Sequence, residues 1–123
     1  MLSHHNLIAF LATVDASRAK PFYETTLGLR LIAEEPFALV FDAHGTMLRI
    51  QKVERFTPPP FTALGWKTLD IAADLQRLRG AGVLAERYPH FEQDELGVWT
   101  APGGGRIAWF KDPDGNTLSL TQF

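Results

Sequence analysis

The groups available for chemistry in this chain are four histidines, 14 acidic residues and the hydroxyl side chains, because the chain has no cysteine. The absence of cysteine excludes disulfides, thiolate zinc sites and cysteine nucleophiles. His90 is of interest because Glu92, Asp94 and Glu95 follow it in a polar stretch. Loops over a pocket often carry function, so His90 is a candidate pocket residue; the alternative is a solvated polar loop.

A calcium loop is one interpretation of the stretch Asp112-Pro113-Asp114-Gly115-Asn116, since its acidic and amide residues match the first three ligand positions of an EF-hand. The match ends there. Thr117 replaces the glycine that the sixth position needs, and Phe123 stands where the bidentate glutamate belongs. Proline and glycine supply turn geometry, so the stretch predicts a turn that directs the strand behind it.

No pair of nucleophile and base is evident. Ser119 has no histidine at a spacing that would activate it. The run Gly103-Gly104-Gly105 lacks the G-x-G-x-x-G spacing of a phosphate loop and predicts a hairpin turn between two strands.

The composition bounds the class of protein. A length of 123 residues predicts one compact domain, and 46% hydrophobic with 21% charged residues is ordinary for a globular protein. A formal charge of −2 without a basic patch argues against nucleic acid as a partner. There is no apolar run of membrane-spanning length and no signal peptide, so we expect no membrane partner. The absence of cysteine fits a cytosolic protein, so we expect a cytoplasmic location.

The order of elements repeats along the chain. Asp15 and Asp70 are each placed to cap a helix after an apolar strand, and Pro21 predicts a distorted first turn or a kink in the first helix. The expected strands are residues 7–14, 29–34, 37–42, 46–53, 64–69, 83–88, 97–101, 106–111 and 117–121. The chain is therefore strand, helix and three strands, then a proline-rich linker, then much the same order again, which favours an α+β domain with one sheet per module.

Two motifs carry a family resemblance. Asp15 is followed by Phe22-Tyr23 and Leu27-Gly28-Leu29, and the chain ends with FKDPDGNTLSL before its last residues. Both resemble the vicinal oxygen chelate superfamily of glyoxalase I, extradiol dioxygenases and the bleomycin- and fosfomycin-resistance proteins. The resemblance implies two βαβββ modules, residues 4–53 and 64–123 with a linker at 54–63, whose mixed sheets curl around a cavity. It also implies a homodimer.

The metal-binding positions of that family provide a test. By the resemblance they correspond to Ile8, Arg49 (Gln51 if the register shifts by two), Trp66 and Ser119. An aliphatic group, a cation, an indole and a hydroxyl do not make a site for a metal that binds imidazole and carboxylate donors. We therefore expect neither a metal nor another cofactor.

Strand parity, anchored at those positions, predicts which side chains face the cavity. They are Ile8 and Phe10; Met47, Arg49 and Gln51; Trp66 and Thr68; and Thr117, Ser119 and Thr121. Arg49 would bind a carboxylate or phosphate, while Trp66 or Trp99 would stack on a ring. The alternatives are an ion pair of Arg49 with Asp42 or Glu54, or its exposure to solvent, and tryptophans that only fill the core.

The sequence thus predicts a metal-free protein that binds a small aromatic or hydrophobic molecule, either neutral or anionic. The expected ligand-binding residues are Ile8, Phe10, Arg49, Gln51, Trp66, His90, Trp99 and Ser119. A glyoxalase-like lyase or isomerase with a non-standard site is the alternative, and a module that acts through its dimer surface is a third reading.

Overall fold

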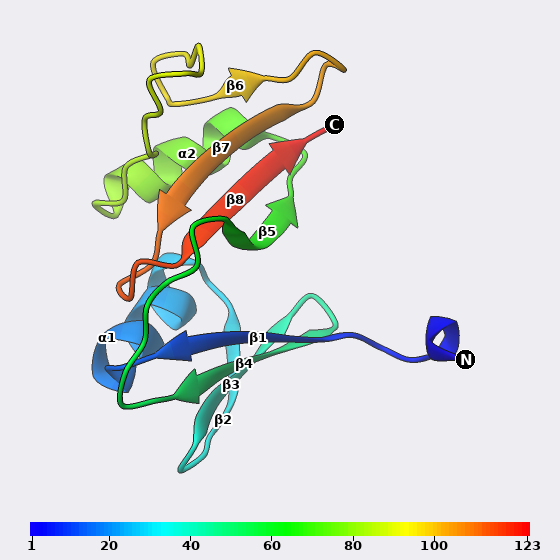
Figure 1. Ribbon diagram of the computed structural model, residues 1–123, viewed down its shortest axis with the longest axis vertical. Helices are drawn as coiled ribbons and strands as arrows, with labels where there is room; N and C mark the ends of the chain where they lie inside the picture. Colours follow the sequence, from blue (N-terminus) through cyan, green and yellow to red (C-terminus); the bar gives the residue numbers. More distant parts are fainter. The chain divides into compact units, whose positions relative to one another are not determined.

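Two four-stranded sheets with the same strand order organise the computed structural model, which describes residues 1–123 (Figure 1). Each sheet belongs to one of two compact units, Met1–Thr57 and Pro58–Phe123. None of the helices combines the length and the apolar character that crossing a membrane requires.

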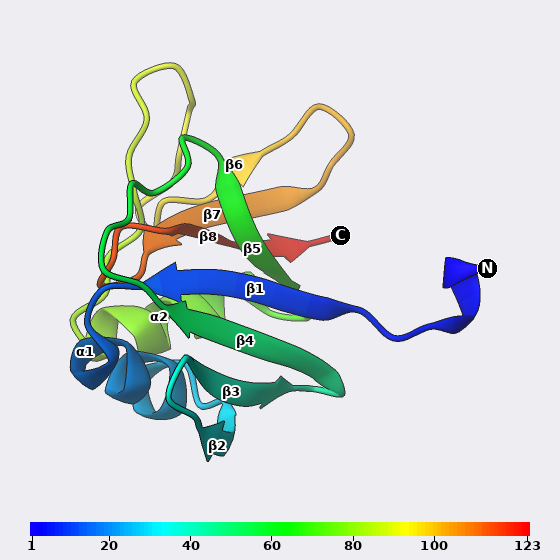
Figure 2. The same cartoon turned by 60° about the horizontal axis from the view of Figure 1, so that its bottom comes forward.

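In the first unit the sheet order is β1-β4-β3-β2, with β1 parallel to β4 and the other pairs antiparallel (Figure 2). The elements are η1 (Leu2–His4), β1 (Ile8–Thr13), α1 (Ala16–Pro21), the π-helical turn η2 (Phe22–Thr26), β2 (Arg30–Glu34), β3 (Ala38–Ala43) and β4 (Thr46–Lys52). A strand, a helix and three further strands thus form one βαβββ module.

The first helix shows the expected effect of its proline. The Asp15 carboxylate accepts a hydrogen bond from Ser17 N at 3.1 Å, as an N-cap does. Hydrogen bonding to the Ser17 side chain, followed by backbone hydrogen bonds, lowers the pKa of Asp15. Pro21 has no N–H to continue the α-helical pattern, and the helix passes into the π-helical turn, where Leu27 N donates to Phe22 O at 2.9 Å. The distortion follows Pro21 rather than falling in the first turn.

One face of the first sheet carries the core of its unit. Tyr23 is fully buried and its ring lies 5.9 Å from that of Phe41, so the helical segment covers the face that carries Phe41. Leu39, Leu48 and Ile50 share this face because they pair in register with one another and with Phe41. The opposite face is called the helix-free face below.

The second unit repeats this plan with the sheet order β5-β8-β7-β6, in which β5 is parallel to β8 (Figure 1). The elements are β5 (Thr62–Lys67), α2 (Ile71–Gly80), β6 (Trp99–Thr100), β7 (Arg106–Lys111) and β8 (Thr117–Gln122). The predicted α+β fold of two βαβββ modules is confirmed.

Helix α2 covers one face of the second sheet. The Asp70 carboxylate caps it by accepting from Ala73 N at 3.1 Å. Ile71 N donates to Gln122 Oε1 at 2.9 Å, and Gln122 alternates along β8 with the same face as Leu118 and Leu120. These leucines are buried, so this is the core face and the other is the helix-free face.

One predicted strand was wrong. Residues 83–88 form no strand, and β6 has only two residues, so the segment finds no long partner strand beside it. Its backbone is satisfied in other ways: Glu86 N donates to Trp109 O at 2.7 Å, and Tyr88 N donates to the side chain of Gln93 at 2.8 Å. The residues between α2 and β6 therefore form a long loop, called the 81–98 loop.

The Asp112–Asn116 stretch is a turn, as its proline and glycine predicted. Asp112 Oδ1 accepts from the backbone N of Asp114 and of Asn116, both at 2.9 Å, and Oδ2 accepts from Asn116 Nδ2 at 2.8 Å. Gly115 has φ +86°, which favours glycine. The aspartate is thus used within the turn that leads into β8.

Candidate ligand-binding site

On the first sheet, the expected pocket residues share the helix-free face. Ile8 lies beside Met47 and Phe10 beside Arg49 in the parallel register of β1 and β4. Ile8 and Phe10 are 49% and 54% exposed. Gln51, also exposed, lies on this face between Ala12 and Ala38.

Arg49 is engaged in an ion pair on this face. Its Nη2 lies 2.7 Å from Glu35 Oε1, and the partner is neither of the two carboxylates that the sequence suggested. Asp42 instead pairs with Arg30 at 3.6 Å. The charge of Arg49 is therefore already compensated, which weakens its case as the anion-binding group.

On the second sheet, the helix-free face presents hydroxyls between aromatic and basic residues. The register places Trp109, Ser119 and Gly65 in one row across β7, β8 and β5, and Lys111, Thr117 and Thr62 in the next. A third row contains Trp99, Ile107, Thr121 and Lys67. All three rows lie on the face away from α2 because side chains alternate along each strand.

Trp66 lies on the other face, which corrects the predicted parity of β5. It pairs with Leu120, on the side that carries α2, whereas Gly65 pairs with Ser119. A Cβ atom added to Gly65 would lie 2.5 Å from Ser119 Oγ, so these two residues meet on the helix-free face. Thr68, predicted to face the cavity with Trp66, donates its hydroxyl to Asp74 of α2.

Five aromatic side chains gather on the helix-free face, and we call them the aromatic cluster: Tyr88, His90, Phe91, Trp99 and Trp109. Phe91 stacks on both tryptophans, with ring centroids 4.4 Å from Trp99 and 5.3 Å from Trp109 and interplanar angles of 23° and 11°. The two indoles lie 6.1 Å apart. Phe91 therefore packs against two neighbouring tryptophans, which form the floor of the cluster.

Tyr88 and His90 close the edge of this stack. Tyr88 meets Trp109 edge to face at 5.5 Å, and the His90 ring lies 4.4 Å from Phe91. Burial, and then the negative charge of Glu86, raises the pKa of Tyr88, so its phenol is neutral at neutral pH. The sequence-predicted residues His90 and Trp99 are thus brought together.

The indole of Trp109 lies across strand β8. Its Nε1 donates to Thr62 Oγ1 of β5 at 3.2 Å, although β8 separates β7 from β5. Ser119 and Thr117 beneath it are 8% and 6% exposed. Ser119 is therefore a buried hydroxyl that the indole shields from solvent.

The loop that supplies half of the cluster is tied to itself by Gln93. The side-chain Oε1 accepts from Tyr88 N, and Nε2 donates to the carbonyls of Glu86 and Gly97, all at 2.8 Å. Arg87 adds two hydrogen bonds of 2.6 Å to the carbonyls of Asp94 and Glu95. Because its polar groups are satisfied internally, the loop holds Tyr88, His90 and Phe91 against the sheet.

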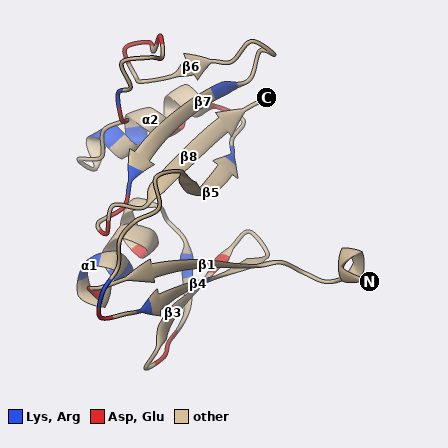
Figure 3. Cartoon of the chain, viewed as in Figure 1, with Lys and Arg blue, Asp and Glu red and all other residues tan.

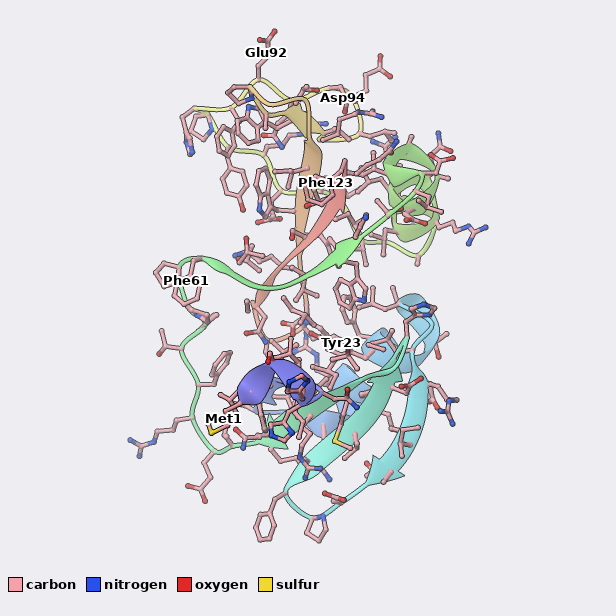
Figure 4. The ribbon with its side chains drawn as sticks, turned by 90° about the vertical axis from the view of Figure 1, so that its right-hand side faces the viewer. Met1, Tyr23, Phe61, Glu92, Asp94 and Phe123 are labelled. Atoms are coloured by element: carbon pink, nitrogen blue, oxygen red, sulfur yellow. The ribbon has the colours of Figure 1, made fainter.

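Sequence reasoning missed Phe91, Tyr88, Gln93 and the role of Trp109 in the site. The available signal was the aromatic density of Tyr88-Pro89-His90-Phe91 within a polar stretch. Figure 3 shows acidic positions gathered on this loop, and Figure 4 shows Glu92 projecting away from the sheet. The loop thus contributes to the site through its aromatic rings and not through its acidic residues.

The donors on these faces do not fit a divalent metal. No three His, Asp or Glu side chains are grouped so that they could hold a metal ion. The expected ligand positions carry Ile8 and Arg49 on the first sheet and Ser119 on the second, and Gly65 occupies the helix-free position next to Ser119. The imidazole and carboxylate donors that such metals require are absent from these positions.

We expect the melting temperature of untagged protein to change by less than about 1 °C when excess Zn²⁺, Ni²⁺ or Mn²⁺ is added, because a ligand stabilises a protein only where it binds the folded state. Differential scanning calorimetry with and without chelator checks this. A His4→Ala/His5→Ala variant controls for the N-terminal histidines. A rise of several degrees with stoichiometric metal uptake in both proteins would contradict the expectation.

The two βαβββ modules, without metal donors at the expected positions, define the class as a two-module α+β protein. A model of the Glyoxalase/Bleomycin resistance protein/Dioxygenase superfamily matches residues 3–120. The chain belongs to this superfamily, so the resemblance found in its sequence is confirmed. A comparison with curated protein sequences found no significant match.

Several solved structures share the fold over nearly the whole chain. A superfamily member from Sphaerobacter thermophilus has 22% identity and a TM-score of 0.76, and covers 100% of both chains. TnmS3, an antibiotic binding protein from Streptomyces sp. CB03234, has 29% identity and a TM-score of 0.73, with 99% of this chain and 98% of that chain covered. Lactoylglutathione lyase from Agrobacterium tumefaciens has 17% identity and a TM-score of 0.73, with 96% and 93% covered.

Proposed function

We propose that this chain is a metal-free binding protein for a small, flat aromatic molecule. The observation that carries the proposal is the aromatic cluster, in which Phe91 stacks on Trp99 and Trp109 on the helix-free face of the second sheet. The nearly parallel rings of Phe91 and Trp109 are suited to stacking on the ring of a ligand. The hydroxyl of Thr62 beside Trp109 offers the ligand a directional polar contact.

The similarity to TnmS3 supports binding as the role. That protein is described as antibiotic binding, and it shares 29% identity with this chain over almost its full length. The donor set supports the metal-free part of the proposal, because the positions that would hold a metal carry no imidazole or carboxylate. The homodimer and the cytoplasmic location expected from the sequence belong to the same proposal.

The lyase or isomerase alternative lacks an arrangement of groups that favours it. His90 packs against Phe91, with the two rings tilted by 49°, but makes no hydrogen bond to another residue that would orient it as a base. Ser119 lies beneath the Trp109 indole and has no histidine beside it. No nucleophile and base are therefore brought within reach of each other, and a binding role accounts better for the site.

A titration with naphthalene-2-carboxamide, followed by NMR of ¹⁵N-labelled protein, tests the proposal. The indole N–H groups of Trp66, Trp99 and Trp109 give one signal each, and single Trp→Phe variants assign them. We expect the signals of Trp99 and Trp109 to shift saturably, with a dissociation constant on the order of 1 mM for a probe of this size.

The saturated analogue cyclohexanecarboxamide is the control, because it has the same polar group without a ring that stacks. Equal shifts with both probes, or no saturable shift with the naphthalene probe, would overturn the proposed function. Steady release of a new product from the probe would favour the enzymatic alternative.

A further inference from the structure

The helix-free face of the second sheet carries two lysines with no carboxylate partner. Neither Lys67 nor Lys111 takes part in the ion pairs Lys20–Glu34, Arg30–Asp42 and Arg49–Glu35. Lys111 is the last residue of β7 and Lys67 the last residue of β5. Figure 3 shows basic positions at both ends of β7, and the strand begins with Arg106 and ends with Lys111.

Lys111 is held in a defined position. Its Nζ donates to Thr117 Oγ1 at 2.6 Å, and Thr117 is only 6% exposed, so the ammonium group is drawn over β8. An ammonium group has three N–H donors. One is used by Thr117, and the others are available to an acceptor above the sheet.

The ammonium group and the indole of Trp109 end at neighbouring points. Trp109 Nε1 donates to Thr62, Lys111 Nζ donates to Thr117, and these two threonines are register partners in β5 and β8. Paired residues on adjacent strands are about 4.8 Å apart. A ring stacked at Trp109 thus lies within reach of the Lys111 ammonium group through a substituent of one or two bonds.

None of the nearby acidic groups forms an ion pair with Lys111. Asp112 follows it in the chain, but its carboxylate oxygens accept hydrogen bonds from Asp114 and Asn116 within the turn. On the 81–98 loop, Glu92 projects away from the sheet (Figure 4), and the Asp94 carboxylate accepts from the backbone of Leu96 and Val98.

The other cations are less suited to the same task. Arg49 is paired with Glu35 at 2.7 Å. Lys67 lies over the ring of Phe123, 5.9 Å from its centroid, and pairs with Thr121, two positions along β8 from Ser119. Arg87 is bound to the carbonyls of the 81–98 loop.

We infer that the Lys111 ammonium group, positioned by Thr117, binds the anionic group of the ligand, which is therefore a flat aromatic acid rather than a neutral aromatic compound. The inference rests on the proposed function, since it places the acid group of the molecule that stacks on Trp109. It also moves the anion-binding role from Arg49, where the sequence suggested it, to β7.

The test compares naphthalene-2-carboxylate with naphthalene-2-carboxamide, which have the same ring and differ in charge. We expect wild-type protein to bind the carboxylate about five-fold more tightly than the carboxamide, as one exposed charged contact provides. Lys111→Met keeps the length of the side chain and removes its charge. We expect this variant to lose the five-fold preference, with a smaller loss of affinity for the carboxamide than for the carboxylate, because the carboxamide oxygen also accepts from the ammonium group.

Lys67→Met is the matched control, because it removes the same charge from the same face and leaves Lys111 in place. Arg49→Met tests the earlier candidate in the same way. If Lys67→Met or Arg49→Met removes the preference and Lys111→Met keeps it, the assignment to Lys111 is overturned. If wild-type protein binds both probes equally, the acid class is overturned and the aromatic binding stands. Binding of neither probe overturns the proposed function and this inference with it.

Discussion

Replacing Trp109 by alanine is expected to weaken the binding of naphthalene-2-carboxamide by about 30-fold, which corresponds to about 2 kcal/mol. The indole is the one ring of the floor that lies across β8, with its N–H on Thr62. Its removal deletes a stacking surface for the ligand and also one of the two rings on which Phe91 rests. NMR titration of the remaining indole signals measures the loss.

Trp66→Phe is the control for this experiment. Trp66 pairs with Leu120 on the face that carries α2, so its replacement removes an indole of the same unit without touching the helix-free face. We expect the probe affinity of Trp66→Phe to stay within about two-fold of wild type, because it makes no contact that the ligand needs. Equal losses in the two variants would place the binding site elsewhere.

Gln93→Glu is expected to open the 81–98 loop. The substitution keeps the size of the side chain but replaces Nε2, which donates to the carbonyls of Glu86 and Gly97, with an oxygen. Both carbonyls lose their donor and face a negative charge, which costs about 2 to 4 kcal/mol in the free energy of the closed loop. We expect the Tyr88 amide to exchange with solvent about 100-fold faster, measured by hydrogen exchange, and probe binding to fall with it.

Glu92→Gln makes the reverse change one residue away. The Glu92 side chain projects from the loop (Figure 4), so neither the exchange of the Tyr88 amide nor the affinity for the probe should change. The global melting temperature should be nearly the same in both variants, because the strand ladders of the second sheet do not depend on Gln93. If the Tyr88 backbone amide still exchanges slowly in Gln93→Glu, the side-chain amide of Gln93 does not hold the loop.

Most of the fold was predictable because its signals are local. The apolar run of 7–14, the caps at Asp15 and Asp70, and the turn before β8 each depend on residues close in sequence. The stretch 83–88 has the composition of a strand but bonds to the Gln93 side chain and to Trp109 O. That competition between a strand partner and a side chain is not visible in the periodicity of the stretch.

The site was less predictable because it depends on which residues meet. The parity of β5 is set by its register with β8, and an irregularity between Thr62 and Leu64 lies just before Gly65. A one-residue error there moved Trp66 to the wrong face. The partner of Arg49 was also missed, since Glu35 reaches it only through the pairing of β2, β3 and β4.

The two modules differ most at one place. After its helix the first module continues with β2, which is bonded along its length to β3, whereas the second module has the 81–98 loop there. The loop bonds largely to itself, through Gln93, Arg87 and Asp94. Its links to the rest of the unit are few: a backbone hydrogen bond to Trp109 O, a bridge to Trp99 of β6, and hydrogen bonds to the C-terminal end of α2. The aromatic residues of such a segment can therefore be substituted, or the whole loop replaced by that of a related protein, without a change in the hydrogen bonding of the strands that support it.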